Sequence, residues 1–379
     1  RIFTNPIILT IAAIEFCTGL VRQGVMQWFP IYVSEVWVLK SNHALVRGDV
    51  TVNTMLLSLG AIALGTALIV TSVRSPALRR WRGSLATAGA LIALSPFMGW
   101  GWGGVLFVAG VIGGNAAGYV SDLFFQSRRA PAAGGLYLFL TVTAVVMIFS
   151  LGKASSDVGW VDGEKEKTLQ VGDRIVAIAG VVDVKDWRDV SKAVKCVPAT
   201  CVAPKVLGEK APPSFWDAEQ CTCSTKRTTN SEGYLASSGM IPATVVRGGE
   251  TLSLELKDPK TKMVAGDARK LAAGPRLTVT PWFLGLLGFI ASLCVIGTHG
   301  LLSGTATMDF GGRKGAATAV GVIDGFVYLG SGLSGIALGK LTTADWSYWP
   351  MFLIPFSMLG FVLCLPIWNS KPRPRGGGH

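Results

Sequence analysis

The sequence has few charged residues and few histidines. Of its 379 residues only 15% are Asp, Glu, Lys or Arg, and three are histidine. Soluble domains carry about 25% charged residues, so this composition, with 50% hydrophobic residues, excludes an ordinary soluble protein and indicates a membrane protein. No His-Glu-x-x-His string occurs, which argues against an intramembrane zinc protease.

The sequence also lacks the usual features of a protein's N-terminus. It begins at Arg1 instead of a methionine, and it has no cleavable signal peptide. We therefore interpret it as a piece of a longer protein.

Long apolar runs, by contrast, are abundant. Seven stretches approach or exceed the ~20 residues that a helix needs to cross a bilayer: 7–33, 52–73, 100–125, 133–152, 281–303, 315–339 and 347–368. An eighth stretch, 83–98, is shorter, and we count it as a span. Between 153 and 279 polar residues crowd in and no window can span. The sequence predicts an α-helical polytopic membrane protein, residues 1–152 and 280–370, with an inserted domain at 153–279 and a basic tail at 371–379.

Basic residues in the short loops predict an orientation. If 83–98 spans, one side carries three basic residues: Lys40, Arg47 and Lys340. The other side carries twelve: Arg1, Arg74, Arg79, Arg80, Arg82, Arg128, Arg129, Arg313, Lys314, Lys371, Arg373 and Arg375. The basic side is expected to be cytoplasmic. This places residues 153–279 in the periplasm of a two-membrane bacterium and the C-terminus in the cytoplasm.

Cysteine usage agrees with an external domain. Three of the seven cysteines lie in apolar spans, and four are clustered in the polar region: Cys196, Cys201, Cys221 and Cys223. In an oxidising compartment an even cluster suggests disulfides, with three connectivities open. A zinc site and unpaired thiols are the alternatives, although C-x4-C with C-x-C fits the usual zinc-ligand spacing poorly.

The polar region contains elements of a small α/β domain. Gly172-Asp173 predicts a turn, 174–179 a strand, and Asp186 the cap of a helix over 187–194. Residues 241–258 read as a hairpin joined at Gly248-Gly249.

This order of elements resembles the PDZ domain in its bacterial, periplasmic form. Residues 195–240, which include the four cysteines, depart from the family as an insertion. PDZ domains bind extended peptides by strand addition, so the resemblance implies a peptide partner. A lid or spacer without a peptide ligand is the alternative.

"GYVSDLFFQSRR", residues 118–129, carries a second resemblance. Gly118 is followed by Asp122 at a helix end and then by Arg128 and Arg129. The acid can pair with the arginines or face the positive end of the next helix. This string resembles the loop signature of the major facilitator superfamily; a simple helix end with solvated charges is the alternative.

Two further strings narrow the resemblance. Residues 5–36 resemble the seventh helix of the organophosphate:phosphate antiporter family, and 297–335, with "KGAATAVG" and "DGFVYLGS", resemble its tenth and eleventh helices. The stretches 100–125, 133–152 and 347–368 then become helices eight, nine and twelve. The six N-terminal helices of that family are absent, and residues 37–99 insert an extra hydrophobic hairpin. The implied fold is the C-terminal half of a major-facilitator transporter with a PDZ-like insertion.

Arg22 interrupts an apolar run, and a charge at such depth costs at least about 2.5–3.5 kcal/mol. The resembled family clamps phosphate with one arginine from each half, and Arg22 matches the arginine of the C-terminal half. Guanidinium stays charged and forks onto phosphate oxygens. Pairing with Glu15, two turns earlier, is the alternative, and it could coexist with phosphate binding.

Other polar residues in the spans are candidate substrate-binding residues. Tyr328 matches a cavity tyrosine of the family, with core packing as the alternative. Asp324 could couple protons or orient a cation, or make a structural hydrogen bond. His299 could sense pH or touch substrate, or simply pack between helices. Gln27 and Trp28 lie one turn beyond Arg22 and could line the cavity.

The sequence thus favours a secondary carrier, not an enzyme, that exchanges organic phosphate such as glycerol 3-phosphate or a sugar phosphate. Its expected partners are the lipid bilayer, the phosphorylated solute, inorganic phosphate and an absent N-terminal half. A membrane-anchored periplasmic PDZ sensor or scaffold is the alternative. A rhomboid-like pair of Ser334 and His299 has only a weak signal in a Gly-rich helix. We expect no cofactor, no metal and no nucleic-acid partner.

Overall fold

The computed structural model describes residues 4–39, 43–48, 50–151, 155–163, 167–178, 181–182, 184–195, 240–257, 271–277 and 279–370. The chain divides into two compact units. The first, here the helical unit, comprises Arg1–Tyr32, Lys40–Leu151 and Val279–His379. The second, the sheet unit, comprises Val33–Leu39 and Gly152–Thr278, so a short segment after the first span belongs with the inserted region.

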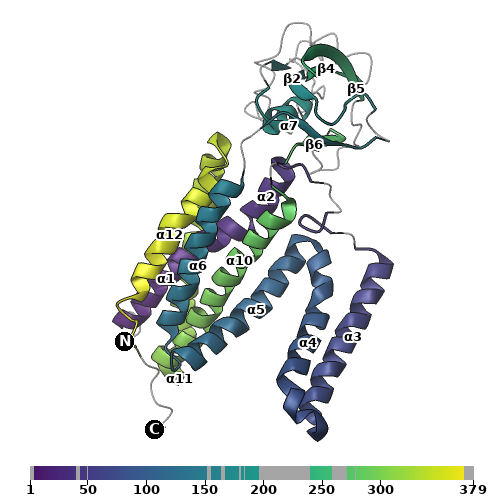
Figure 1. The fold of residues 1–379 in the computed structure, drawn as a ribbon. Helices are drawn as coiled ribbons and strands as arrows, with labels where there is room; N and C mark the ends of the chain where they lie inside the picture. The colour runs from purple at the N-terminus through teal and green to yellow at the C-terminus, as the bar shows by residue number, and fades with distance from the viewer. Residues whose placement is uncertain are drawn as a thin grey trace, which may run out of the picture. The chain divides into compact units, whose positions relative to one another are not determined.

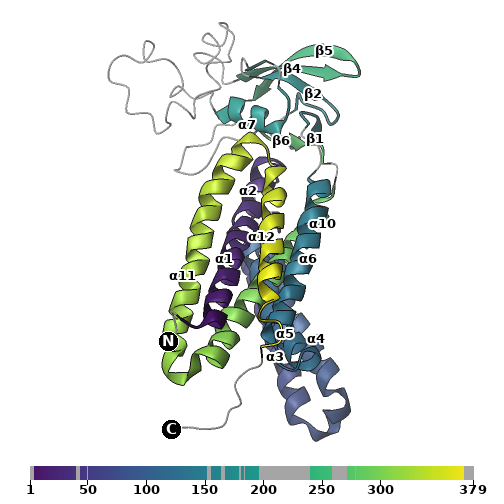
Figure 2. The ribbon, with the colours of Figure 1, turned by 90° about the vertical axis from the view of Figure 1, so that its left-hand side faces the viewer.

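Helices account for almost all of the described helical unit (Figures 1 and 2). They are α1 Pro6–Met26, α2 Trp28–Glu35, α3 Val52–Arg74, α4 Arg82–Leu94, α5 Gly101–Phe124, α6 Arg129–Ser150, α10 Pro281–His299, α11 Thr307–Ala344 and α12 Tyr348–Cys364. Two 3₁₀ segments, η1 Pro76–Trp81 and η2 Ser95–Gly99, flank α4, and the π-helical segment η5, Gly300–Ala306, joins α10 to α11.

Within the described residues, six helical stretches are long and apolar enough to cross a membrane. They correspond to six of the predicted spans, and the chain is a multi-pass membrane protein. The seventh, α12, has 17 residues, at the lower limit of about 17 for a span.

The eighth predicted span, 83–98, is divided between the α-helix α4 and the 3₁₀ segment η2, and its crossing of the membrane stays a prediction. Helix α4 has 13 residues, about 20 Å at 1.5 Å per residue, which is less than the ~30 Å hydrocarbon core. The reason is proline. Pro96 has no N–H to donate to the Ile92 carbonyl, which accepts instead from the Ser95 hydroxyl at 2.9 Å. The chain continues in the 5-residue 3₁₀ segment η2, which adds about 10 Å at about 2.0 Å per residue.

Helix α1 lies at the centre of a bundle in which it packs against α10, α11 and α12, while α6 packs against α10 and α12 (Figures 1 and 2). Its apolar residues recur on several faces, as expected for a helix covered on most sides. Ile11, Ile14 and Val21 are fully buried there, against Tyr137 and Leu140 of α6 and other core residues. This packing holds the polar residues of α1 deep in the protein.

The first span is interrupted where a single helix was expected. Pro30 has no N–H, so the carbonyl of Met26 loses its helical donor four residues later. The helix divides at Gln27, and two indoles from other helices bond to carbonyls beside the break. Trp102 donates to the Met26 carbonyl at 2.9 Å and Trp349 to the Gly24 carbonyl at 2.7 Å.

The inserted hairpin forms from α3 and α4, which pack against each other (Figure 1). Gly65 and Gly89 allow the close approach, because a Cβ on either would clash with the backbone carbonyl of the other. Small residues let membrane helices approach closely in this way.

The sheet unit contains a four-stranded antiparallel sheet in the order β3-β2-β4-β5 and a separate pair, β1 with β6. The strands are β1 Val158–Val161, β2 Arg174–Ile178, β3 Val181–Val182, β4 Met240–Arg247, β5 Glu250–Lys257 and β6 Ala273–Pro275, and the helix is α7 Trp187–Lys195. The predicted strand, helix and hairpin are confirmed. The pair β1–β6 was not predicted.

Local signals explain these elements. Gly248 and Gly249 have φ of 58° and 91°, the positive values that a tight hairpin turn requires. Asp186 caps α7, since its Oδ1 accepts from the amides of Arg188 and Asp189 at 2.8 and 3.1 Å. One core joins the sheet to α7 and the segment 33–39, with Ile175, Trp187, Val190, Ile241, Leu256 and Val38 among its buried members.

The predicted insertion, 195–240, lies almost wholly outside the described residues. Cys196, Cys201, Cys221 and Cys223 all fall there, and their disulfides stay a prediction. The three described cysteines, Cys17, Cys294 and Cys364, are free and buried in the helical unit.

Candidate functional site

A buried carboxylate and a histidine meet in the core of the helical unit. Glu15 of α1 is 0% exposed, and its Oε2 lies 2.9 Å from Nδ1 of His299 at the end of α10. The other carboxylate oxygen, Oε1, has no hydrogen-bond partner among the described residues. The histidine ring is 27% exposed, so the pair reaches from the core toward a more open surface.

Arg22 lies two turns further along α1 and is half-buried. Because Glu15 pairs with His299, the alternative pairing of Arg22 with Glu15 is wrong. Within the described part of the chain Arg22 makes no hydrogen bond and no ion pair. A guanidinium in a membrane span without a protein partner has its donors available for an anion.

Asp324 and Tyr328 follow one another by one turn on α11. Asp324 is half-buried, and its Oδ1 accepts a hydrogen bond of 2.6 Å from the Ser303 hydroxyl on η5. Tyr328 is 74% exposed, so it is not part of the core. Of the predicted residues beyond Arg22, Gln27 is exposed at the helix break, and Trp28 packs edge-on against Trp346 at 5.9 Å.

Electrostatic interactions connect four of these side chains. The charges of Arg22, Glu15 and Asp324 all act on His299, and that of Asp324 also acts on Glu15. The structure therefore brings two acids, one histidine and one arginine from α1, α10 and α11 into one polar cluster inside an apolar bundle. Sequence reasoning had proposed three of these residues separately and had treated Glu15 only as a partner for Arg22.

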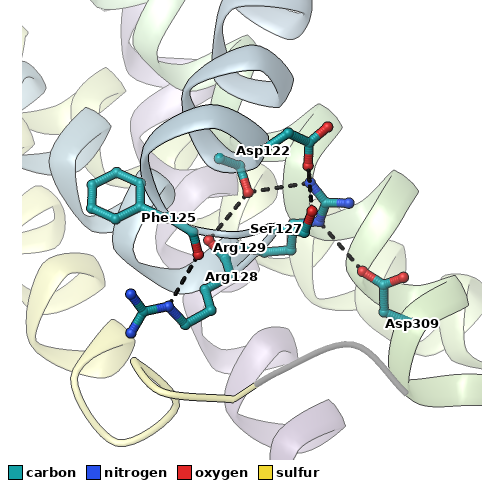
Figure 3. A network of polar contacts seen from close by, with 7 residues as sticks. Asp122, Phe125, Ser127, Arg128, Arg129 and Asp309 are labelled. Atoms are coloured by element: carbon teal, nitrogen blue, oxygen red, sulfur yellow. Dashed lines mark hydrogen bonds and ion pairs between the residues drawn. The ribbon is translucent and has the colours of Figure 1, made fainter. Parts of the chain in front are cut away.

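The loop between α5 and α6 holds a second polar network (Figure 3). Asp122 accepts from Arg129 Nη1 at 2.7 Å and from the Ser127 hydroxyl at 2.9 Å. Arg129 also reaches Asp309 of α11, with Nε at 3.3 Å from Oδ2. One guanidinium thus joins α5, α6 and α11.

Arg128 has a different role from Arg129. Its Nε donates to the Phe125 carbonyl at 3.0 Å (Figure 3). Its Nη1 donates to Asn369 Oδ1 at 3.1 Å. The tight turn before it needs left-handed backbone at Gln126 and Ser127, with φ of 55° and 62°. A Cβ atom added at Gly118 would have no described atom within 4 Å, so close packing in the described residues does not explain a glycine at this position.

Sequence reasoning missed Asp309 and Ser303. Asp309 belongs to a 38-residue helix that begins eight residues earlier than the predicted span at 315. An acid beside an apolar segment is a signal that could have identified it. No sequence signal identifies Ser303, because the π-helical geometry of its segment is not visible in the sequence.

Metal binding has no support in the part of the chain that the structure describes, where no group of three or more His, Cys, Asp or Glu side chains is placed to hold an ion. The polar cluster instead offers one guanidinium, one imidazole and two carboxyl groups, a set suited to an anion and to protons.

Comparison with known proteins connects part of the chain to transport. It is 31% identical over 94 residues to a probable hexose phosphate transport protein of Chlamydia trachomatis and 30% identical over 93 residues to one of Chlamydia pneumoniae. Each match covers 24% of this chain and 20% of the relative, so the chain spans about a fifth of the length of the curated relatives it matches. No protein-family model matches the sequence, and no solved structure matches it significantly.

Proposed function

We propose that this chain supplies the C-terminal half of a secondary carrier that exchanges an organic phosphate, such as a sugar phosphate or glycerol 3-phosphate, for inorganic phosphate. The observation that carries the proposal is Arg22: a half-buried guanidinium in a membrane helix, with no protein partner among the described residues. The partial similarity to proteins named as hexose phosphate transporters supports the same substrate class.

The chemistry of Arg22 suits a phosphate ester. A guanidinium is always charged and presents two parallel N–H groups to two phosphate oxygens, whereas an ammonium is a point charge. Charge-assisted hydrogen bonds of this kind contribute about 1.5–3 kcal/mol each. A dianion needs more than one cation in a low-dielectric site, and the second arginine is expected from the N-terminal half. The two halves would rock about the bound ester.

Other residues fill supporting roles in this proposal. Tyr328, exposed on α11, offers a neutral hydroxyl donor to a phosphate oxygen or to the sugar. Asp324 and His299 would affect ester binding through the electrostatic charge around Arg22. Gln27 and Trp28 would line the cavity beyond Arg22. The Asp122–Arg129–Asp309 network would hold α5, α6 and α11 together as the halves move.

The proposed location is the inner membrane of a bacterium, with the sheet unit in the periplasm and the C-terminus in the cytoplasm. The asymmetry of basic residues supports this orientation, provided that 83–98 spans the membrane. The sheet unit would be a PDZ-like domain, supported by the strand β2, the helix α7 and the closing hairpin β4–β5.

The same sheet unit supports a second candidate, a membrane-anchored periplasmic sensor or scaffold that binds peptides. It has its own core of Ile175, Trp187 and Ile241, separate from that of the helices. In this case the helices would only anchor the unit, and substitution of Arg22 would leave peptide capture unchanged.

Phosphate-ester exchange in vesicles that contain the full-length protein tests the proposal. Arg22→Ala should reduce exchange most. Arg22→Lys should reduce it less, because the positive charge remains although the two parallel N–H donors are lost. Tyr328→Phe should reduce it least, because it removes one neutral hydrogen-bond donor. Cys294→Ala, a small change in the buried core of α10, is the control and should leave exchange near normal. Near-normal exchange by a correctly inserted Arg22→Ala protein would contradict the proposal.

A further inference from the structure

Glu15 is enclosed more completely than an ionised carboxylate tolerates without compensation. Its side chain is 0% exposed, Oε2 meets the His299 ring at 2.9 Å, and Oε1 has no hydrogen-bond partner among the described residues. An ionised carboxylate with an unsatisfied oxygen is costly in a low dielectric, and a bound proton removes that cost. The histidine, 27% exposed, is the side of the pair that protons can reach.

Few charged groups surround the pair. Among the described residues, the titratable side chains that share the buried core or an electrostatic interaction with the pair are Arg22 and Cys17 of α1, Tyr137 of α6, Cys294 of α10, Asp324 of α11 and Cys364 of α12. The thiols and the phenol are neutral in this apolar core. The tyrosine is in any case bonded, donating to the Ile14 carbonyl at 2.9 Å and lying 2.7 Å from the Thr18 hydroxyl. Among the described residues, Arg22 and Asp324 are the charged groups that remain to bias the charge of the pair.

We propose that Glu15 and His299 form a proton-binding site whose occupancy is coupled to a phosphate ester at Arg22. The proposal rests on the proposed function and names the coupling partner of that site. With one shared proton the pair is neutral, whether it is written as carboxylate and imidazolium or as carboxylic acid and imidazole. A second proton, taken from water on the open side of His299, leaves Glu15 as a carboxylic acid beside an imidazolium. No covalent bond other than those to hydrogen changes.

The state of Arg22 decides whether the second proton binds. While Arg22 has no anion, its positive charge repels a positively charged pair, and the pair keeps one proton. A dianionic ester neutralises the positive charge of the site and so removes this repulsion, which favours the second proton. By linkage, protonation of the pair strengthens ester binding by the same factor by which the ester strengthens protonation.

Proton uptake on ester binding tests this coupling directly. The full-length protein is titrated with glucose 6-phosphate in two buffers of different ionisation enthalpy, which gives the number of protons taken up per ester bound. The wild type should take up more protons than the double variant Glu15→Gln with His299→Gln, by up to about one proton per ester. The ester's own titration is the same in both proteins and cancels. Cys17→Ala, a change in the same buried core, should keep the wild-type uptake.

A second variant covers the case in which the double variant does not fold. His299→Gln alone leaves Glu15 buried with its own proton, so it should also lose the extra uptake. Equal uptake by the wild type and either variant, with the ester still bound, would overturn the proton site and leave the proposed function standing. Failure of the wild type to bind the ester would overturn the proposed function and the coupling with it.

Discussion

The two compact units place their charged side chains in opposite ways. In the sheet unit Asp173 is 1% exposed, and both of its carboxylate oxygens accept hydrogen bonds. Arg247 donates from Nε to Oδ1 at 2.7 Å and from Nη2 to Oδ2 at 2.8 Å. The backbone amide of Gln170 also donates to Oδ2, at 2.8 Å. In the helical unit Arg22 has no partner in the described residues and Glu15 keeps one oxygen unbonded. A satisfied charge stabilises the fold around it. A charge left unsatisfied in a membrane indicates a ligand.

The largest expected effect on stability comes from breaking the satisfied pair. Arg247→Ala leaves Asp173 buried without its cation and should clearly destabilise the sheet unit, because removing one partner of a buried pair leaves an uncompensated charge. Hydrogen exchange of the β2 and β4 amides in the full chain measures this.

The matched control is another ion pair of the same unit. Arg174 lies 2.8 Å from Asp157 but is 64% exposed, and such surface pairs contribute little to stability because water screens them. Arg174→Ala should therefore change the exchange rates little. Equal losses of protection in the two variants would show that burial does not distinguish these pairs.

A smaller effect is expected at the break in the first span. Trp102→Phe keeps an aromatic ring where Trp102 stacks on Phe29 at 3.9 Å, but it removes part of the indole and the N–H bonded to the Met26 carbonyl, which Pro30 cannot satisfy. The loss should be about 1–3 kcal/mol for a buried acceptor left unpaired, seen as a lower thermal midpoint in detergent. Trp282→Phe, at a 58% exposed site, should leave the midpoint unchanged, and a drop equal to that of Trp102→Phe would contradict this account.

The smallest expected effect near neutral pH is the change in stability of the sheet unit as the pH falls. Hydrogen bonds from Arg247 hold the pKa of Asp173 below its usual range, although burial opposes them. A lowered pKa means that this contribution is complete above the ordinary carboxyl value of about 3.9 and is lost as the pH falls through the folded value. Protection of β2 should therefore be constant from about pH 7 to 5 and decline below about 4. Asp173→Asn should lose the part of that decline due to this group; an unchanged decline would assign it to other carboxylates.

The sequence predicted those elements whose signals are local. Apolar length identified the long helices, and Gly248-Gly249 and Asp186 located the hairpin and the start of α7. The strands β1 and β6 were missed because each has only three or four residues and their pairing joins segments about a hundred residues apart.

The candidate site was predictable only in part, for the same reason. A charge in an apolar run singles out Arg22 and Asp324 by itself. Which residue faces Glu15 depends on how α1 packs against α10, since His299 lies 284 residues away in the chain. The link from Arg129 to Asp309 likewise depends on packing, across 180 residues.

The central claim is that Arg22 is kept without a protein partner in order to bind a phosphate ester. Its most direct test is one titration of the full-length wild type and Arg22→Ala with glucose 6-phosphate, accompanied by a thermal unfolding curve for each. We expect affinity to fall by at least about tenfold, since a charge-assisted bond is lost, while the unfolding midpoint stays the same or rises. Unchanged affinity, or a midpoint that falls together with the affinity, would contradict the claim and assign Arg22 to the fold.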